Sequence, residues 1–216
     1  MLGKFITFEG PEKSGKSTQA KLLSRYLRGL GYPTLFVREP GSTRIGEKIR
    51  RLLLDKKNIE MSAMTEMILY MAARSQLVDQ VIRPALKKGR IVLCDRFLDS
   101  TIAYQGYGCG LDIGRIKKVG LLATGGLKPD LTLLLDFSKS CTHLKNHKSP
   151  DRIEMRCDAF HRKVRNGYFA LAKKEPGRIK RIVVASDRNV TQKIIRETVA
   201  QCLLKRSSAK RTPSRF

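Results

Sequence analysis

The fold is decided by residues 5–17, which read FITFEGPEKSGKS. The apolar and β-branched run Phe5–Phe8 predicts a short β-strand. The stretch from Gly10 to Ser17 matches G-x-x-x-x-G-K-[ST], and a helical pattern follows it to about Leu30. In a strand–loop–helix of this kind, backbone N–H groups and the positive end of the helix surround phosphate oxygens. The sequence therefore predicts a phosphate-binding loop.

Single residues of this loop have distinct chemical roles. Gly10 and Gly15 permit backbone angles and a close approach that a Cβ would forbid. Lys16 brings a positive charge to the β- and γ-phosphates, and the Ser17 hydroxyl is a ligand for Mg²⁺. We expect ATP to contact the loop and the start of the helix, at Gly10, Pro11, Glu12, Lys13, Ser14, Gly15, Lys16, Ser17 and Thr18.

Strand and helix patterns alternate along the rest of the chain. Apolar runs predict strands at residues 5–8, 34–37, 91–94, 131–135 and 179–184. Helical patterns fill residues 17–30, 43–54, 62–88, 111–123, 152–174 and 191–204. This alternation is typical of an α/β fold whose parallel sheet is covered on both faces. No repeat or linker divides the chain, so we expect one domain over residues 1–204 and a basic, disordered tail over 205–216.

Composition narrows the possible classes of function. Of 216 residues, 44 are Lys or Arg and 19 are Asp or Glu, which gives a formal net charge of +25. No zinc-finger spacing or RNA-recognition signature accompanies this charge, so we favour a site for small anionic substrates over nucleic-acid binding. The absence of long apolar stretches and of a signal-peptide pattern predicts a cytoplasmic protein without a membrane span. The five cysteines are odd in number and lack C-x-x-C spacing, so we expect neither a disulfide framework nor a zinc site.

Two carboxylates follow apolar strands. Asp95 comes directly after Ile91–Cys94, and Asp136 comes after the run at 131–135. Open α/β sheets bind ligands at the carboxyl ends of their strands. We prefer Asp95 as the acid near Mg²⁺, because Arg96 beside it pairs an acid with a cation. Asp136 is its rival, and an ordinary ion pair at a strand end is an equal interpretation of Asp136.

Longer stretches carry a resemblance to a known family. They are FITFEG (5–10), REPGST (38–43), IRRLLL (49–54), DRFLDS (95–100), AYQG (103–106), PDLTLLLD (129–136) and DRIE (151–154). With these motifs the chain resembles the thymidylate kinases from Lys4 to about Leu204. The resemblance implies that the γ-phosphoryl group of ATP is transferred to dTMP in the presence of Mg²⁺. It also implies a three-layer sandwich of the P-loop NTPase type with a five-stranded parallel sheet, a short mobile lid over residues 138–152 and a homodimer.

The resemblance further implies roles for single residues. Glu12 matches the acid that meets the deoxyribose 3′-hydroxyl, Tyr70 an aromatic ring that stacks on thymine, and Arg74 an arginine that donates to a thymine carbonyl. Helical periodicity alone would favour packing for Tyr70 and a solvated charge for Arg74. Arg38 is equally interpretable as an ion-pair partner. The implied contacts with dTMP are Glu12, Arg38, Arg50, Tyr70, Arg74, Arg96, Ser100 and Gln105.

Within the resemblance, two arrangements neutralise charge between donor and acceptor. One places a basic residue in the phosphate loop, here Lys13, and the other takes basic residues from the lid. This chain has both, and our hypothesis is that they are redundant; the alternative is that they belong to a solvated basic surface. The implied catalytic residues are Lys13, Lys16, Asp95, Arg96, Lys145, Lys148 and Arg152, with Ser17 and Asp95 near Mg²⁺.

The chain also departs from the family pattern. Ser42 stands where glycine is usual, which implies a small strain if that position needs a positive φ. Two other functions stay open at this point. One is a kinase for a different nucleoside monophosphate. The other is a nucleotide-binding regulator or nucleic-acid-binding module that keeps the fold without the reaction.

Overall fold

In the part of the chain that the structure describes, the sheet has five strands, all parallel, in the order β2-β3-β1-β4-β5. The computed structural model describes residues 3–137 and 150–204. Within them the strands are β1 (Lys4–Glu9), β2 (Thr34–Arg38), β3 (Ile91–Asp95), β4 (Leu131–Phe137) and β5 (Ile179–Val184). The predicted α/β class, the five predicted strands and their parallel arrangement are confirmed.

The strand order places the phosphate loop next to the point where successive connections of the chain run to opposite sides of β1. β1 lies between β3 and β4, with Phe8 opposite Asp95 on one side and Leu133 on the other. The chain leaves β1 toward β2 and β3, and later returns to β4 on the opposite side of β1. In an open parallel sheet this divergence leaves a crevice at the carboxyl ends of the strands. The loop after β1 and the end of β3 therefore meet there.

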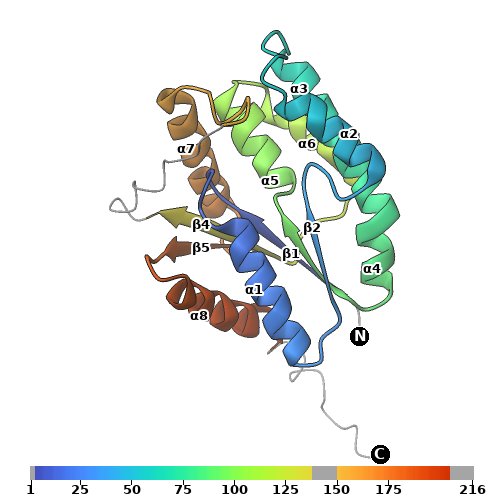
Figure 1. Cartoon of the computed structure of the whole chain (residues 1–216), viewed down its shortest axis with the longest axis vertical. Helices are drawn as coiled ribbons and strands as arrows, with labels where there is room; N and C mark the ends of the chain where they lie inside the picture. Colours follow the sequence, from blue (N-terminus) through green and yellow to red (C-terminus); the bar gives the residue numbers. More distant parts are fainter. Residues whose placement is uncertain (1–2, 138–149, 205–216) are drawn as a thin grey trace, which may run out of the picture.

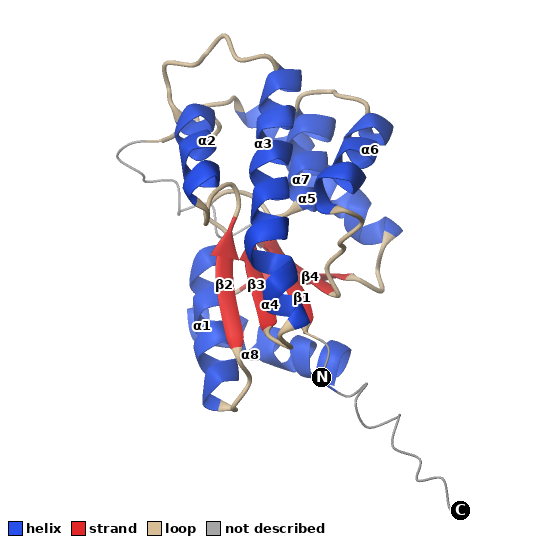
Figure 2. Cartoon of the chain, turned by 90° about the vertical axis from the view of Figure 1, so that its right-hand side faces the viewer, coloured by secondary structure: helices blue, strands red, loops and turns tan. Residues whose placement is uncertain are grey.

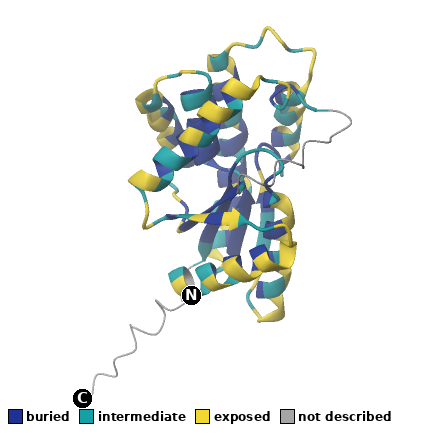
Figure 3. Ribbon diagram, turned by 90° about the vertical axis from the view of Figure 1, so that its left-hand side faces the viewer, coloured by how far each residue is buried: buried dark blue, intermediate teal, exposed yellow. Residues whose placement is uncertain are grey.

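Helices cover both faces of the sheet, as Figure 1 shows. One face carries α1 (Lys16–Gly29) and α8 (Arg188–Val199), which continues as the π-helix η4 (Ala200–Leu204). The other side carries α2 (Arg44–Leu54), α3 (Ala63–Leu77), η1 (Val78–Ile82), α4 (Arg83–Lys87), α5 (Leu98–Thr101), η2 (Ile102–Gly108), α6 (Ile113–Thr124) and α7 (Asp158–Lys174). Figure 3 shows the strands buried between helices that expose their outer faces.

Alternating side chains of the strands form two cores. Ile6 and Phe8 of β1 pack with Leu23 and Leu27 of α1 on one face. Phe5 points to the other face, where it packs in the cluster that holds Leu77, Val78 and Ile82. A third cluster joins α3, η2, α6 and α7. Because both faces of the sheet are covered, its strands read as continuous apolar runs in the sequence.

The predicted helix at 62–88 is one path with an irregular middle. α3, η1 and α4 follow one another without a loop, and the ladder widens to π geometry just before Pro84. Proline removes one backbone donor and crowds the preceding turn, so a local change of helical geometry is expected there.

The region around the β3–α6 connection differs from the prediction. α5 and η2 cover residues 98–108, where the sequence predicts no helix, because two glycines and two β-branched residues obscure the helical period there. α7 begins at Asp158 and not at Arg152. The Asp151 carboxylate accepts from the backbone N–H groups of Ile153 and Glu154 at 2.9 Å, which favours a turn over helix.

In the part of the chain that the structure describes, no helix has the length and apolarity of a membrane-spanning segment.

Candidate active site

The phosphate loop has the backbone that its sequence predicts. Gly10 has φ 137°, and a Cβ at this residue would lie 2.1 Å from the carbonyl oxygen of Leu135. Gly15 has φ 80° and forms the N-cap of α1. Both positions are therefore restricted to glycine, one by close approach and strain and the other by its left-handed backbone.

Lys16 and Ser17 begin α1 and face a large cavity. Lys16 is buried, and its Nζ donates to the Pro11 carbonyl at 2.7 Å and to Ser14 Oγ at 3.3 Å. Burial and the nearby Arg96 lower the pKa of the Lys16 ammonium to about 8, although Glu12 opposes this. The Ser17 hydroxyl donates to the Asp95 carboxylate at the end of β3.

Arg96 is the centre of the site. Its guanidinium lies 2.7 Å from a Glu12 oxygen and donates at 3.2 Å to the hydroxyls of Ser100, Tyr104 and Tyr168. Burial alone would lower the pKa of Arg96, but the Glu12 carboxylate keeps it well above its ordinary value. Its backbone has φ 69°, an uncommon conformation for a residue with a side chain, and such strain concentrates at functional sites.

Glu12 reaches from the phosphate loop to Arg96. Tyr104 donates to its carboxylate at 2.9 Å. Burial would raise the pKa of Glu12, but Arg96 and Lys16 lower it to about 2. Glu12 is therefore ionised at neutral pH and is an acceptor for a hydroxyl group.

The buried carboxylate of Glu9 forms hydrogen bonds that fix the strained turn at Arg96. Its carboxylate accepts from the backbone N–H of Phe97 at 2.7 Å and from the Tyr168 hydroxyl at 3.1 Å, and Ser100 donates to it as well. Burial, with the charge of Asp99, raises the pKa of Glu9 to about 7. These bonds hold the backbone that aims the Arg96 side chain.

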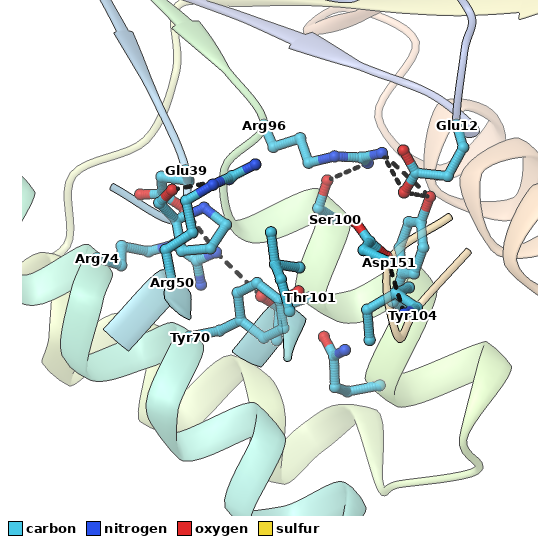
Figure 4. Close-up of a pocket in the computed structure, with 14 residues that line it drawn as sticks. Glu12, Glu39, Arg50, Tyr70, Arg74, Arg96, Ser100, Thr101, Tyr104 and Asp151 are labelled. Carbon is cyan, nitrogen blue, oxygen red and sulfur yellow. Dashed lines mark hydrogen bonds and ion pairs between the residues drawn. The ribbon is translucent and has the colours of Figure 1, made fainter. Parts of the chain in front are cut away.

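Two adjoining cavities lie at this crevice. The first is drawn in Figure 4 and is lined by Glu12, Glu39, Pro40, Arg50, Leu54, Tyr70, Arg74, Arg96, Ser100, Thr101, Tyr104, Gln105, Asp151 and Ile153. The second has a volume of about 570 Å³ and is lined by Glu12, Lys13, Gly15, Lys16, Ser17, Thr18, Arg38, Glu39, Arg50, Asp95 and Arg96. Four residues line both cavities: Glu12, Glu39, Arg50 and Arg96.

Arg74 occupies the first cavity in an unexpected way. It is only 1% exposed, so the solvated charge that periodicity favours is wrong. Its guanidinium donates to Glu39 at 2.8 Å, to the Phe97 carbonyl at 3.1 Å and to Thr101 Oγ1 at 3.0 Å. Most of its five N–H donors are therefore held by protein acceptors. Figure 4 shows Tyr70 and Arg74 on the same side of this cavity.

The other arginines predicted to meet dTMP differ in their surroundings. Arg50 donates to the Pro40 carbonyl at 3.0 Å and lines both cavities. Arg38 lines the second cavity and forms a half-exposed ion pair with Glu47 at 2.9 Å, so its interpretation as an ion-pair partner is confirmed and its contact with dTMP stays a prediction. Ser42 has φ 64°, as its position requires, and its hydroxyl accepts from the Arg38 N–H at 2.9 Å.

Of the three basic residues expected to act from the lid, the structure describes only Arg152. Lys145 and Lys148 lie outside the described residues, as does most of the predicted lid. Arg152 is buried, donates to the Leu53 carbonyl at 2.9 Å and pairs with Glu66, and it lines neither cavity. The structure thus places Arg152 in a buried ion pair with Glu66, and the catalytic role that the resemblance implies for it stays a prediction. Lys13 lines the second cavity with φ 62°.

Asp136 forms ion pairs with two arginines outside both cavities. Arg165 and Arg181 pair with its carboxylate at 2.8 and 2.7 Å, and it lines neither cavity. The ion-pair interpretation of Asp136 is therefore confirmed, and Asp95 is the strand-end acid beside the phosphate loop.

Sequence reasoning missed several residues of the site. Tyr104, Glu39 and Asp151 line the first cavity, and Tyr168 binds Arg96 from α7. Tyr104 stands beside Gln105 in the AYQG motif, so the motif itself was a signal for it. Tyr168 has no local signal, because it meets Arg96 across 72 positions of sequence.

Comparison with known proteins agrees with this geometry. The family model described as thymidylate kinase matches residues 8–195. A thymidylate kinase of Pelotomaculum thermopropionicum is 49% identical over 189 residues, 86% of this chain and 87% of that protein. A thymidylate kinase of Geotalea daltonii is 45% identical over 208 residues, 92% of this chain and 96% of that protein. The crystal structure of thymidylate kinase from Ehrlichia chaffeensis superposes with a TM-score of 0.76 at 34% identity, covering 92% of this chain and 99% of that one. The chain belongs to the thymidylate kinase family.

Proposed function

We propose that this thymidylate kinase binds dTMP in the first cavity and ATP over the phosphate loop in the second, and transfers the γ-phosphoryl group where the two cavities meet. One observation carries this assignment: Arg50 and Arg96 line both cavities, beside the Glu12 carboxylate. Two guanidiniums at a shared boundary suit a donor phosphate on one side and an acceptor phosphate on the other.

The first cavity has groups for each part of dTMP. The Tyr70 ring can stack on the base, and a remaining Arg74 donor and Gln105 can meet the base edge, with Ser100 nearby. Glu12, held ionised, accepts from the 3′-hydroxyl of the sugar. We assign the acceptor phosphate to Arg96 and Arg50, which line both cavities, and to Arg38, which lines the second.

The reaction needs positioning more than proton transfer. The attacking atom is already an anionic phosphate oxygen at neutral pH, so no general base is required. Lys16 and Arg96 neutralise charge that is spread over the transferring group, and their places are set before the substrates arrive. Lys13 lines the same cavity and is assigned to the donor phosphates. Enclosure of both nucleotides keeps water from the γ-phosphoryl group.

The residues at the phosphate loop also fit Mg²⁺. Ser17 Oγ and the Asp95 carboxylate are hard oxygen ligands in direct contact at the second cavity. Among the described residues no cluster of three His, Cys, Asp or Glu side chains forms a closed metal site. Mg²⁺ in kinases is held by one or two protein oxygens, nucleotide phosphates and water, which matches this donor set. When bound, it supplies charge neutralisation at the donor phosphates.

We expect base choice to test the assignment most directly. If Arg74 and Gln105 meet thymine, kcat/KM for dTMP should exceed that for dCMP by a factor of about 10³ or more, because cytosine leaves buried polar groups unpaired. dUMP, which lacks only a methyl group, should be intermediate. A coupled assay of ADP release with each acceptor measures this. Equal rates with dTMP and dCMP would favour a general nucleoside monophosphate kinase, and no acceptor-dependent ADP release would favour a regulator without the reaction.

A homodimer is the second part of the proposal. Leu52 of α2, Ile68 of α3 and Leu121 and Leu122 of α6 are exposed, Leu122 by 83%. These three helices lie side by side, as Figure 2 shows. Exposed apolar side chains gathered on neighbouring elements mark association surfaces.

A cytoplasmic location also stays a prediction of the sequence.

Loss of this surface should give monomers. We expect the wild type to sediment at twice the monomer mass of 24.4 kDa, and the double variant Ile68→Lys/Leu122→Lys at the monomer mass. Two buried charges at an interface leave unpaired ions, which opposes association. Leu30→Lys, an exposed leucine just beyond α1, is the matched control and should stay dimeric. A wild type that is monomeric at micromolar concentration would contradict the proposal.

A further inference from the structure

Glu66 of α3 is a buried carboxylate that lines neither cavity. Its side chain is 0% exposed, and three donors reach it. Gln105 Nε2 donates to Oε1 at 2.7 Å, Arg156 Nη2 donates to Oε2 at 2.7 Å, and Arg152 donates to Oε2 as well. Two of these donors are guanidiniums, which pair with Glu66 as an ionised carboxylate.

Gln105 is the one of these partners that lines the first cavity. A glutamine amide has a donor end and an acceptor end, whereas an ionised carboxylate only accepts. Glu66 therefore holds the NH₂ end of Gln105 and excludes the reversed amide. The carbonyl Oε1 is the end left for a ligand, and no hydrogen bond from another described residue reaches it.

We propose that Glu66 is a positioning residue that selects thymine over cytosine, by fixing the Gln105 amide with its carbonyl toward the base. The inference rests on the proposed function, which puts the base in the first cavity. Thymine carries an N–H donor at ring position 3, and cytosine carries an acceptor there. A fixed acceptor at Gln105 pairs with the first and opposes the second.

Without Glu66, the Gln105 amide would discriminate poorly between thymine and cytosine. The two ends of an amide have nearly the same shape, and rotation about its last torsion exchanges them. A freely turning amide would donate to cytosine as readily as it accepts from thymine. Discrimination by this residue therefore comes from the buried carboxylate behind it. Arg74, fixed by Glu39 and Thr101, is a separate donor that continues to favour a carbonyl on the base.

The test compares acceptor preference among variants, as the ratio of kcat/KM for dTMP to that for dCMP at saturating MgATP. In Glu66→Gln the new amide offers Gln105 both an acceptor and a donor, so both orientations become possible. We expect the ratio to fall about tenfold or more, and to stay above one because Arg74 remains. In a Gln105→Leu background, adding Glu66→Gln should leave the ratio unchanged, because Glu66 then has no amide to orient.

A double variant that exchanges the residues at positions 66 and 105 separates the effect on base selection from any loss of stability. Glu66→Gln leaves Arg152 and Arg156 without a buried counter-charge and can lower stability. The double variant Glu66→Gln/Gln105→Glu keeps that charge in the cluster. Its carboxylate at position 105 only accepts, from the amide at position 66 and from the N–H of thymine. We expect it to restore the wild-type ratio to within about threefold.

Three outcomes would overturn the inference. They are an unchanged ratio in folded Glu66→Gln, an equal fall when Glu66→Gln is added to Gln105→Leu, and an exchange variant that fails to prefer dTMP. In each of these the wild type still prefers dTMP, so the proposed function stands and only the role of Glu66 is lost. A wild type that does not distinguish dTMP from dCMP removes the base assignment, and this inference with it.

Discussion

Lys16→Ala should lower kcat by about a hundredfold or more, because it removes one preorganised charge from the transferring phosphoryl group. Lys16 begins α1, lines the second cavity, and has its Nζ held by Pro11 and Ser14. Alanine is a strong helix former, so α1 should remain and the variant should fold. Coupled ADP release gives kcat, and a thermal melt checks folding. A folded variant with turnover near that of the wild type would contradict the phosphate-loop assignment.

The pH dependence of kcat/KM for ATP is an independent check on the role of Lys16. Burial and Arg96 lower the pKa of Lys16 to about 8, so the lysine of the free enzyme loses its proton as the pH rises through that value. We expect kcat/KM for ATP, which reports on the free enzyme, to fall above pH 8. Bound phosphates stabilise the ammonium, so kcat should persist to higher pH. Lys16→Ala should lack this fall.

The local parts of the site could be predicted from the sequence. The loop between β1 and α1 is continuous in the chain, and its glycines and Lys16 are set by spacing alone. Asp95 was predictable because a wholly apolar strand ends directly before it. These features depend on neighbours in sequence, which is the range in which patterns of hydrophobicity and turn chemistry carry information.

The long-range parts could not be predicted in this way. Arg74 is as polar as any exposed arginine, and its burial is explained by acceptors that lie 23 to 35 positions away in the chain, at Phe97, Thr101 and Glu39. Glu66 meets Arg152 across 86 positions, and nothing in the sequence around either residue indicates that the other is its partner. Burying a charge is costly without a partner, so each buried ion implies a paired one, but the sequence does not say which. The catalytic role expected for Arg152 came from its place beside the predicted lid, and the sequence gives no sign of its ion pair with Glu66.

The second large effect is expected at Arg96. Arg96→Ala should lower kcat by about a thousandfold or more, because its guanidinium lies on the boundary of both cavities where the phosphoryl group would pass. It would also leave Glu12 without the ion pair that keeps this carboxylate in place. Arg96→Lys should recover little, because a single ammonium cannot reproduce the fork that reaches Glu12 and three hydroxyls.

A matched glycine variant separates the side chain from the backbone. Arg96 has φ 69°, a conformation in which alanine is strained by about 1–2 kcal/mol and glycine is not. If the loss in Arg96→Ala came from collapse of this turn, Arg96→Gly would recover turnover, because Glu9 could still cap the backbone at Phe97. If the guanidinium itself stabilises the transition state, Arg96→Gly should melt at a higher temperature than Arg96→Ala yet be equally slow. We expect the second result, and turnover within about tenfold of the wild type in Arg96→Gly would refute the catalytic role.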